Sequence, residues 1–103
     1  MPVRERRPIH PGEILAEDIL PEPGMNANQV GEALGVPANR ISKILRGRRS
    51  ITADTALRLG RWLGSSPQFW MNLQRSYDLE VADQESGDAI RKRVTPLDKP
   101  VAA

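Results

Sequence analysis

Hydrophobic residues recur at spacings of three and four along most of this chain, which is the pattern of amphipathic helices. No stretch alternates β-branched and polar residues in the manner of a β-strand. Proline, glycine and capping residues divide the pattern into separate segments. We therefore predict an all-α fold of five helices, which begin near His10, Asn26, Pro37, Thr52 and Ser66.

Local signals mark the ends of these helices. Pro11 suits the first helical position, and we expect the first helix to run to Pro21. Asn26 and Gln29 have the spacing of a capping box at the start of the second helix. Gly35 is a natural left-handed end for that helix.

The helical pattern of the fifth segment fades after about Gln84. Beyond it the chain is rich in cations and prolines, which is typical of a terminal tail. The organisation that we expect is a flexible arm over residues 1–8, a folded domain over 9–84 and a flexible tail over 85–103.

The twenty residues that start at Ala27 fit a helix-turn-helix unit formed by the second and third helices. Two short helices joined by a tight turn cross steeply, so they need apolar residues on their facing sides, a small residue where they approach and a glycine in the turn. Gly35 supplies the turn, and Gly31 stands where alanine would be more usual. The facing apolar positions are Val30, Leu34, Val36, Ile41 and Ile44.

Charge is unevenly distributed along the chain. The formal net charge is only +2, yet residues 33–53 contain no acid and five cations, which leaves the remainder at −3. A plain helical hairpin does not require such a patch, whereas a surface that binds phosphates does. The five cations are Arg40, Lys43, Arg46, Arg48 and Arg49.

Composition excludes several classes of protein. The 103 residues have room for one domain, and with no cysteine and a single histidine they hold no disulfide, thiol nucleophile or zinc site. No nucleophile–base pair or phosphate-cradling glycine loop is present, so we expect neither an enzyme nor a cofactor. No apolar run approaches the roughly 20 residues of a membrane span, and the N-terminal residues lead into no apolar stretch of a signal peptide, so we expect a cytoplasmic protein.

Five strings are distinctive, and they are His10–Leu15, Leu34–Val36, Ile41–Thr52, Asp54–Leu59 and Pro67–Gln74. Together they resemble the HigA antitoxins of the wider Xre or lambda-repressor-like group. The string Phe69–Gln74 is specific to the HigA branch, and the resemblance covers about residues 9–82. It implies a five-helix lambda-repressor-like domain, a homodimer, binding to the operator of its own operon, and neutralisation of a HigB-type toxin, which is an RNA-cleaving, ribosome-dependent nuclease.

In a helix-turn-helix the recognition helix enters the major groove by its N-terminal end. Asn39 has the paired donor and acceptor that adenine requires, Lys43 can donate to guanine, and Ala38 is small enough to pack against a thymine methyl. Arg40 either reads a base or clamps a phosphate. We therefore predict base contacts by Ala38, Asn39, Arg40 and Lys43.

Amides at a helix N-terminus and cations in a loop hold a duplex without reading it. Gln29 has an alternative role in capping its helix, and Asn28 has one as a solvated side chain. The residues for which we predict phosphate contacts are Asn26, Asn28, Gln29, Ser42, Arg46, Arg48 and Arg49.

The aromatic residues have three possible roles, in the core, in a dimer surface and in toxin binding. We assign Trp70 and Leu73 mainly to the core, and Trp62 and Tyr77 to part of the dimer interface. We interpret His10 as an ordinary residue at a helix start.

Glu13, Glu17 and Asp18 form a solvated acidic face on the first helix. A toxin that holds RNA must be basic, so this face is a candidate docking surface. The expected partners are thus double-stranded operator DNA, a HigB-type toxin and a second copy of the chain, with no membrane. The alternative function is a stand-alone Xre-family transcriptional regulator without a toxin.

Overall fold

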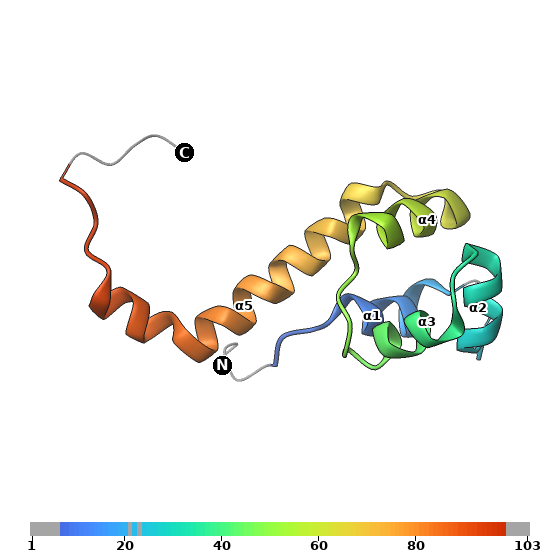
Figure 1. Cartoon of the computed structure of the whole chain (residues 1–103), viewed down its shortest axis with the longest axis horizontal. Helices are drawn as coiled ribbons and strands as arrows, with labels where there is room; N and C mark the ends of the chain where they lie inside the picture. The colour runs from blue at the N-terminus through green and yellow to red at the C-terminus, as the bar shows by residue number, and fades with distance from the viewer. Residues whose placement is uncertain (1–6, 21, 23, 99–103) are drawn as a thin grey trace.

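The computed structural model describes residues 7–20, 22 and 24–98, and over these residues its regular structure is entirely helical (Figure 1). The five predicted helices are all present and in the predicted order, so the all-α fold class is confirmed. The elements are α1 (Pro11–Ile14), the π-helical segment η2 (Leu15–Ile19), α2 (Ala27–Leu34), α3 (Ala38–Leu45), α4 (Ala53–Leu63) and α5 (Pro67–Arg93).

The predicted caps are present at both ends of α2. The Asn26 side chain accepts from the backbone N–H of Gln29, and the Gln29 side chain accepts from the backbone N–H of Asn26, both at 2.9 Å. Gly35 closes the helix with φ of 73°, a conformation that side chains with a Cβ rarely adopt. The sequence therefore specifies the limits of α2 by local chemistry alone.

The first helix differs from the prediction of one regular helix that runs to Pro21. It widens into η2 after Ile14, where the backbone N–H of Leu20 bonds to the carbonyl of Leu15 at 3.1 Å. Leu15 is buried, and Ile19 and Leu20 also pack against the core. Pro21 itself lies outside the described residues.

The core lies where η2, α2, α3, α4 and the first half of α5 meet. Trp70 is completely buried, and its indole N–H donates to Ser65 Oγ at 3.1 Å. Leu73 is partly buried against the same cluster, so both residues assigned to the core from the sequence lie there. The buried hydrophobic residues are Leu15, Val30, Leu34, Ile41, Ile44, Ile51, Ala56, Leu59 and Trp70.

Two glycines allow close approaches that fix the angle between helices. A Cβ on Gly31 would lie 2.8 Å from the carbonyl oxygen of Val36, which is backbone and cannot swing away. A Cβ on Gly12 would overlap the carbonyl group of Ile44 in α3. Gly31 is thus required by the turn of the helix-turn-helix unit, and the more usual alanine would not fit here.

Helix α5 is longer than predicted. It packs on α4 through its first half and continues past Gln84 to Arg93, so its second half projects beyond the folded unit (Figure 1). The molecule measures 52 × 32 × 24 Å as a result. The prediction that the helical pattern ends near Gln84 is therefore wrong. The second half has no core beside it, so only a few widely spaced apolar residues mark it as helical in the sequence.

The domain limits and the flexibility of the two ends stay predictions. Most of the arm expected over residues 1–8 and the end of the tail, residues 99–103, lie outside the described part of the chain.

Candidate nucleic-acid interface

One face of α3 is polar and open to solvent. Asn39, Lys43 and Arg46 are exposed, and their spacing of four and three residues places them along one side of the helix. The opposite side carries Ile41 and Ile44, which are 1% and 0% exposed. The core thereby orients α3 so that these three long polar side chains face outward.

Ala38 and Ser42 flank this face and are half-buried. Arg48 and Arg49 are exposed in the turn that follows α3. The turn is held by backbone hydrogen bonds, from Arg48 N–H to the Lys43 carbonyl at 2.8 Å and from Gly47 N–H to the Ile44 carbonyl at 2.9 Å. The side chains of Arg48 and Arg49 are therefore attached to a backbone that hydrogen bonds hold in place at the end of the recognition helix.

The His10 side chain packs against this turn, a role that the sequence did not reveal. Its ring is buried, its Nδ1 accepts from the Gly12 backbone N–H at 2.9 Å, and it meets the Tyr77 ring edge to face at 4.9 Å. Burial lowers the pKa of His10, against a backbone hydrogen bond with Arg49 and nearby acidic groups that favour the charged form. His10 thus joins α1, the turn after α3 and α5.

The candidate phosphate contacts at the start of α2 are exposed. These are Asn26, Asn28 and Gln29. The capping box uses the side-chain oxygens Oδ1 of Asn26 and Oε1 of Gln29 as acceptors. The NH₂ groups of the same two side chains are therefore available to donate to a phosphate.

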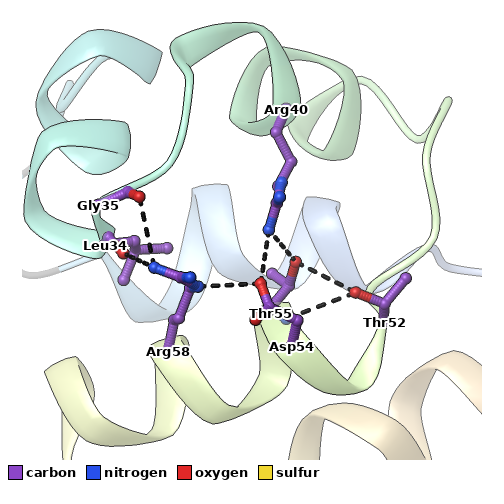
Figure 2. A network of polar contacts seen from close by, with 7 residues as sticks. All are labelled: Leu34, Gly35, Arg40, Thr52, Asp54, Thr55 and Arg58. Carbon is purple, nitrogen blue, oxygen red and sulfur yellow. Dashed lines mark hydrogen bonds and ion pairs between the residues drawn. The ribbon is translucent and has the colours of Figure 1, made fainter.

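Arg40 does not join the exposed face of α3. Its guanidinium turns toward α4, where Nη1 lies 2.8 Å from Asp54 Oδ2 and 3.5 Å from Thr55 Oγ1 (Figure 2). Its side chain is only 24% exposed. The structure thus separates Arg40 from Asn39 and Lys43, with which the sequence had grouped it.

The same carboxylate binds a second guanidinium. Arg58 Nε lies 2.9 Å from Asp54 Oδ2, and Arg58 Nη1 donates to the carbonyls of Leu34 at 2.8 Å and Gly35 at 3.3 Å (Figure 2). The hydrogen bonds from Arg40 and then from Arg58 lower the pKa of Asp54. Sequence reasoning missed this network, since only the i, i+4 spacing of Asp54 and Arg58 is visible along the chain.

The two residues predicted for the dimer interface are only half exposed. Trp62 lines a groove of about 450 Å³ beside Ala33 and Leu57, and the Leu57 side chain is 61% exposed. Tyr77 is engaged by His10. Their part in a dimer stays a prediction.

The acidic face of the first helix is partly neutralised. Both carboxylate oxygens of Glu13 accept from Arg7, at 2.9 and 2.7 Å, and this pairing lowers the pKa of Glu13. Glu17 and Asp18 are exposed. These two residues therefore carry most of the free negative charge of that face.

Over the described part of the chain, no group of three or more histidine, cysteine or acidic side chains is placed to hold a metal ion. None of the described helices is both long and apolar enough to cross a membrane.

Comparison with known proteins identifies the class of protein. A family model described as helix-turn-helix matches residues 19–70, which include α2, α3 and α4. The virulence-associated protein I of Dichelobacter nodosus is 51% identical over 77 residues, which cover 75% of this chain and 71% of that protein.

Two solved structures narrow the class. An addiction module antidote protein of the HigA family from Coxiella burnetii has 53% identity and a TM-score of 0.81, with 89% of this chain and 100% of that chain covered. Pseudomonas aeruginosa antitoxin HigA, solved with the higBA promoter, has 45% identity and a TM-score of 0.83, with 88% and 99% covered. The chain belongs to the helix-turn-helix family and, within it, to the HigA antitoxins, a non-enzymatic DNA-binding branch.

Proposed function

We propose that this chain is an antitoxin that binds the operator of its own operon as a homodimer and neutralises a HigB-type toxin. The observation that carries the proposal is the open polar face of α3, with Asn39, Lys43 and Arg46 exposed along it. The P. aeruginosa HigA that was solved with its promoter has the same fold over nearly the whole chain, which supports the same use of this face.

Within that face we assign separate tasks to the side chains. Asn39 reads a base beside Ala38, because both lie at the N-terminal end of α3, the part that enters the major groove. Lys43 reads a base from the same exposed face one turn further on. Arg46, Arg48 and Arg49 contact phosphates at its C-terminal end, with Ser42 and the amides at the start of α2. Arg40 leaves the base-reading set because Asp54 engages its guanidinium.

A second copy of the chain is the partner that DNA reading requires, since one helix-turn-helix unit contacts only a few base pairs. The second half of α5 offers the surface. Leu79 and Ile90 are 64% and 52% exposed, and they line a shallow apolar groove of about 200 Å³ together with Ala82. We define the α5 strip as Leu79, Ala82 and Ile90.

Charge along α5 favours an antiparallel pair. The acidic residues between 78 and 88 precede the cationic last turn formed by Arg91, Lys92 and Arg93. In an antiparallel arrangement the acidic stretch of one copy lies opposite the cationic turn of the other, and the two strips cover each other. The α5 strip is therefore our main dimer surface, and Trp62 and Tyr77 are secondary candidates.

Toxin neutralisation needs no chemistry by this chain. A nuclease that holds RNA presents a basic surface, and the exposed carboxylates of Glu17 and Asp18 are suited to meet it. Coverage of the toxin, which blocks its active site or its access to the ribosome, is then sufficient. Both activities belong to the cytoplasm, where the operator and the ribosomes are.

The operator part of the proposal is tested by titration of the promoter next to the gene, and of a scrambled duplex, at several salt concentrations. Arg46→Ala should weaken binding to both duplexes and reduce the slope of log affinity against log salt by about 0.9, because one phosphate contact is lost. Asn39→Ala should cost about 1 to 3 kcal/mol on the operator alone. Equal losses on both duplexes for Asn39→Ala would remove it from the base-reading residues.

A further inference from the structure

A single carboxylate oxygen beside the recognition helix accepts hydrogen bonds from two arginines. Asp54 Oδ2, in the first turn of α4, accepts from Arg40 of α3 at 2.8 Å and from Arg58 of α4 at 2.9 Å. Arg58 continues the connection to the carbonyl at the end of α2. Asp54 thus ties α3 to α4, and Arg58, which binds the same carboxylate, ties α4 to the end of α2 (Figure 2).

The placement of Arg40 makes this contact relevant to DNA. Arg40 follows Asn39 directly, so its Cα lies about 100° around the helix from a residue on the exposed face, within reach of that face for a side chain as long as arginine. The pair with Asp54 draws the guanidinium to the α4 side instead. A cation next to the DNA face is therefore held away from it.

A DNA phosphate could compete with Asp54 for the guanidinium of Arg40. Asp54 is 56% exposed, and its single Oδ2 atom serves two guanidinium groups. Exposed ion pairs are weak, and a DNA phosphate is an equally good acceptor for a guanidinium. Without the carboxylate, the Arg40 guanidinium would have a DNA phosphate as an alternative acceptor.

We propose that Asp54 is a positioning residue that withholds Arg40 from the DNA backbone and thereby limits binding to non-operator sequences. A phosphate contact adds a similar free energy on every duplex, so withholding it lowers the absolute affinity for non-operator DNA and leaves discrimination to the base contacts. Arg58 assists, because its Nε binds the same carboxylate oxygen and helps to hold it in place. This inference rests on the proposed DNA-binding function.

The test is the salt dependence of binding to a scrambled duplex. Asp54→Asn keeps the shape of the side chain but removes its charge. We expect the slope of log affinity against log salt to become steeper by about 0.9, with about a tenfold gain in affinity for the scrambled duplex at 50 mM salt, as one added phosphate contact gives. The double variant Asp54→Asn with Arg40→Ala should return to the slope of the unmodified chain.

Glu32→Gln is the matched control. Glu32 is exposed in α2 and makes no ion pair within the described residues, so this variant loses the same charge without release of a guanidinium. We expect its salt slope to remain unchanged. If Glu32→Gln and Asp54→Asn behaved alike, the gain would be an effect of net charge and the proposal would be wrong.

Arg40→Ala in the otherwise unmodified chain gives a second, independent test that does not depend on the folding of Asp54→Asn. We expect it to leave the salt slope unchanged, whereas Arg46→Ala reduces it. A loss of about 0.9 for Arg40→Ala would show that Arg40 already contacts a phosphate, which contradicts the inference about Asp54 and leaves operator binding intact. Failure of the unmodified chain to prefer the promoter over the scrambled duplex would instead contradict the proposed function.

Discussion

His10 shows how one side chain can serve segments that are distant in the sequence. It caps α1 through Gly12, packs on Tyr77 of α5 and lies against the turn that carries Arg48 and Arg49. Because Nδ1 accepts a hydrogen bond from the Gly12 N–H and the ring is buried, the neutral form of this histidine fits the site best. The rigidity of the cationic turn should therefore depend on the protonation state of this residue.

His10 gives a prediction for the pH dependence of stability. Its pKa is below the ordinary value in the folded chain, so the unfolded chain takes up a proton more readily as the pH falls below about 6.5. The free energy of unfolding should then decrease from pH 7.5 to pH 5.5, measured by urea denaturation. It is the only histidine, and most carboxylates titrate below this range.

His10→Asn is the control for that measurement. Asparagine keeps an acceptor at the cap but does not titrate, so the decrease between pH 7.5 and pH 5.5 should largely disappear. At pH 7.5 the variant should be less stable by about 1 kcal/mol, because the ring contact with Tyr77 is lost. A decrease with pH as large as that of the unmodified chain would show that other groups cause it.

At the scale of elements, the helix-turn-helix unit depends on how closely α2 approaches the turn that follows it. The Val36 carbonyl oxygen lies so close to Gly31 that a side-chain methyl group on residue 31 would clash with it. The Val36 N–H donates to the Gly31 carbonyl at 3.0 Å, which holds the two residues together. Helix propensity favours alanine over glycine by about 1 kcal/mol, so the two effects oppose each other.

Gly31→Ala tests which effect is larger. The backbone carbonyl cannot move without disruption of the turn, so we expect a net loss of about 1 to 2 kcal/mol in the free energy of unfolding despite the better helix propensity. Ala33→Gly, at an exposed position of the same helix, measures the propensity effect by itself. A Gly31→Ala variant that is more stable than the unmodified chain would mean that the turn adjusts without cost.

At the scale of the whole molecule, α5 gives the chain its elongated form. The Cα radius of gyration is 16.9 Å, whereas a compact domain of this length has about 13 Å. The projecting half keeps its helical form with an apolar strip that faces no other part of the described chain, and Arg91 bridges Asp83 and Asp88 beside it. An isolated helix with such a strip is most readily explained by a partner along it.

The α5 strip leads to a prediction about oligomeric state. The unmodified chain should sediment as a dimer at micromolar concentration, and Ile90→Lys should weaken the dimer by at least 30-fold, about 2 kcal/mol, because a charge enters the apolar contact. Gln84→Lys adds the same charge outside the strip and should leave the dimer intact. The palindromic operator expected for a dimer should have half-sites about one helical turn apart or a multiple of it.

If Ile90→Lys sedimented as the unmodified chain does, the contact would lie elsewhere, and Trp62→Ala would be the next variant to measure.

Toxin binding gives a prediction that separates the two surfaces. Expression of the adjacent small gene should arrest growth, and co-expression of this chain should relieve the arrest. The double variant Asn39→Ala with Lys43→Ala should lose operator binding but keep the relief, because the acidic face of the first helix is unchanged. Loss of both activities in a stably folded variant would show that DNA and toxin share one surface.

The sequence by itself determined the helices and the helix-turn-helix unit, because caps, helix-ending glycines and apolar periodicity act within a few residues of one another. The capping box of Asn26 and Gln29 and the buried positions of Ile41 and Ile44 are read directly from such spacing. The exposed face of α3 follows from them, since what is not buried must face outward.

The tertiary structure alone decided how individual polar side chains are used. Arg40 pairs with an acid fourteen residues away, and His10 meets a ring on α5, the last helix of the sequence. The length of α5 was equally hidden, since a helix surrounded by solvent on most sides needs no strict periodicity. Such features depend on which segments the core brings together, and no spacing rule along a single chain contains that information.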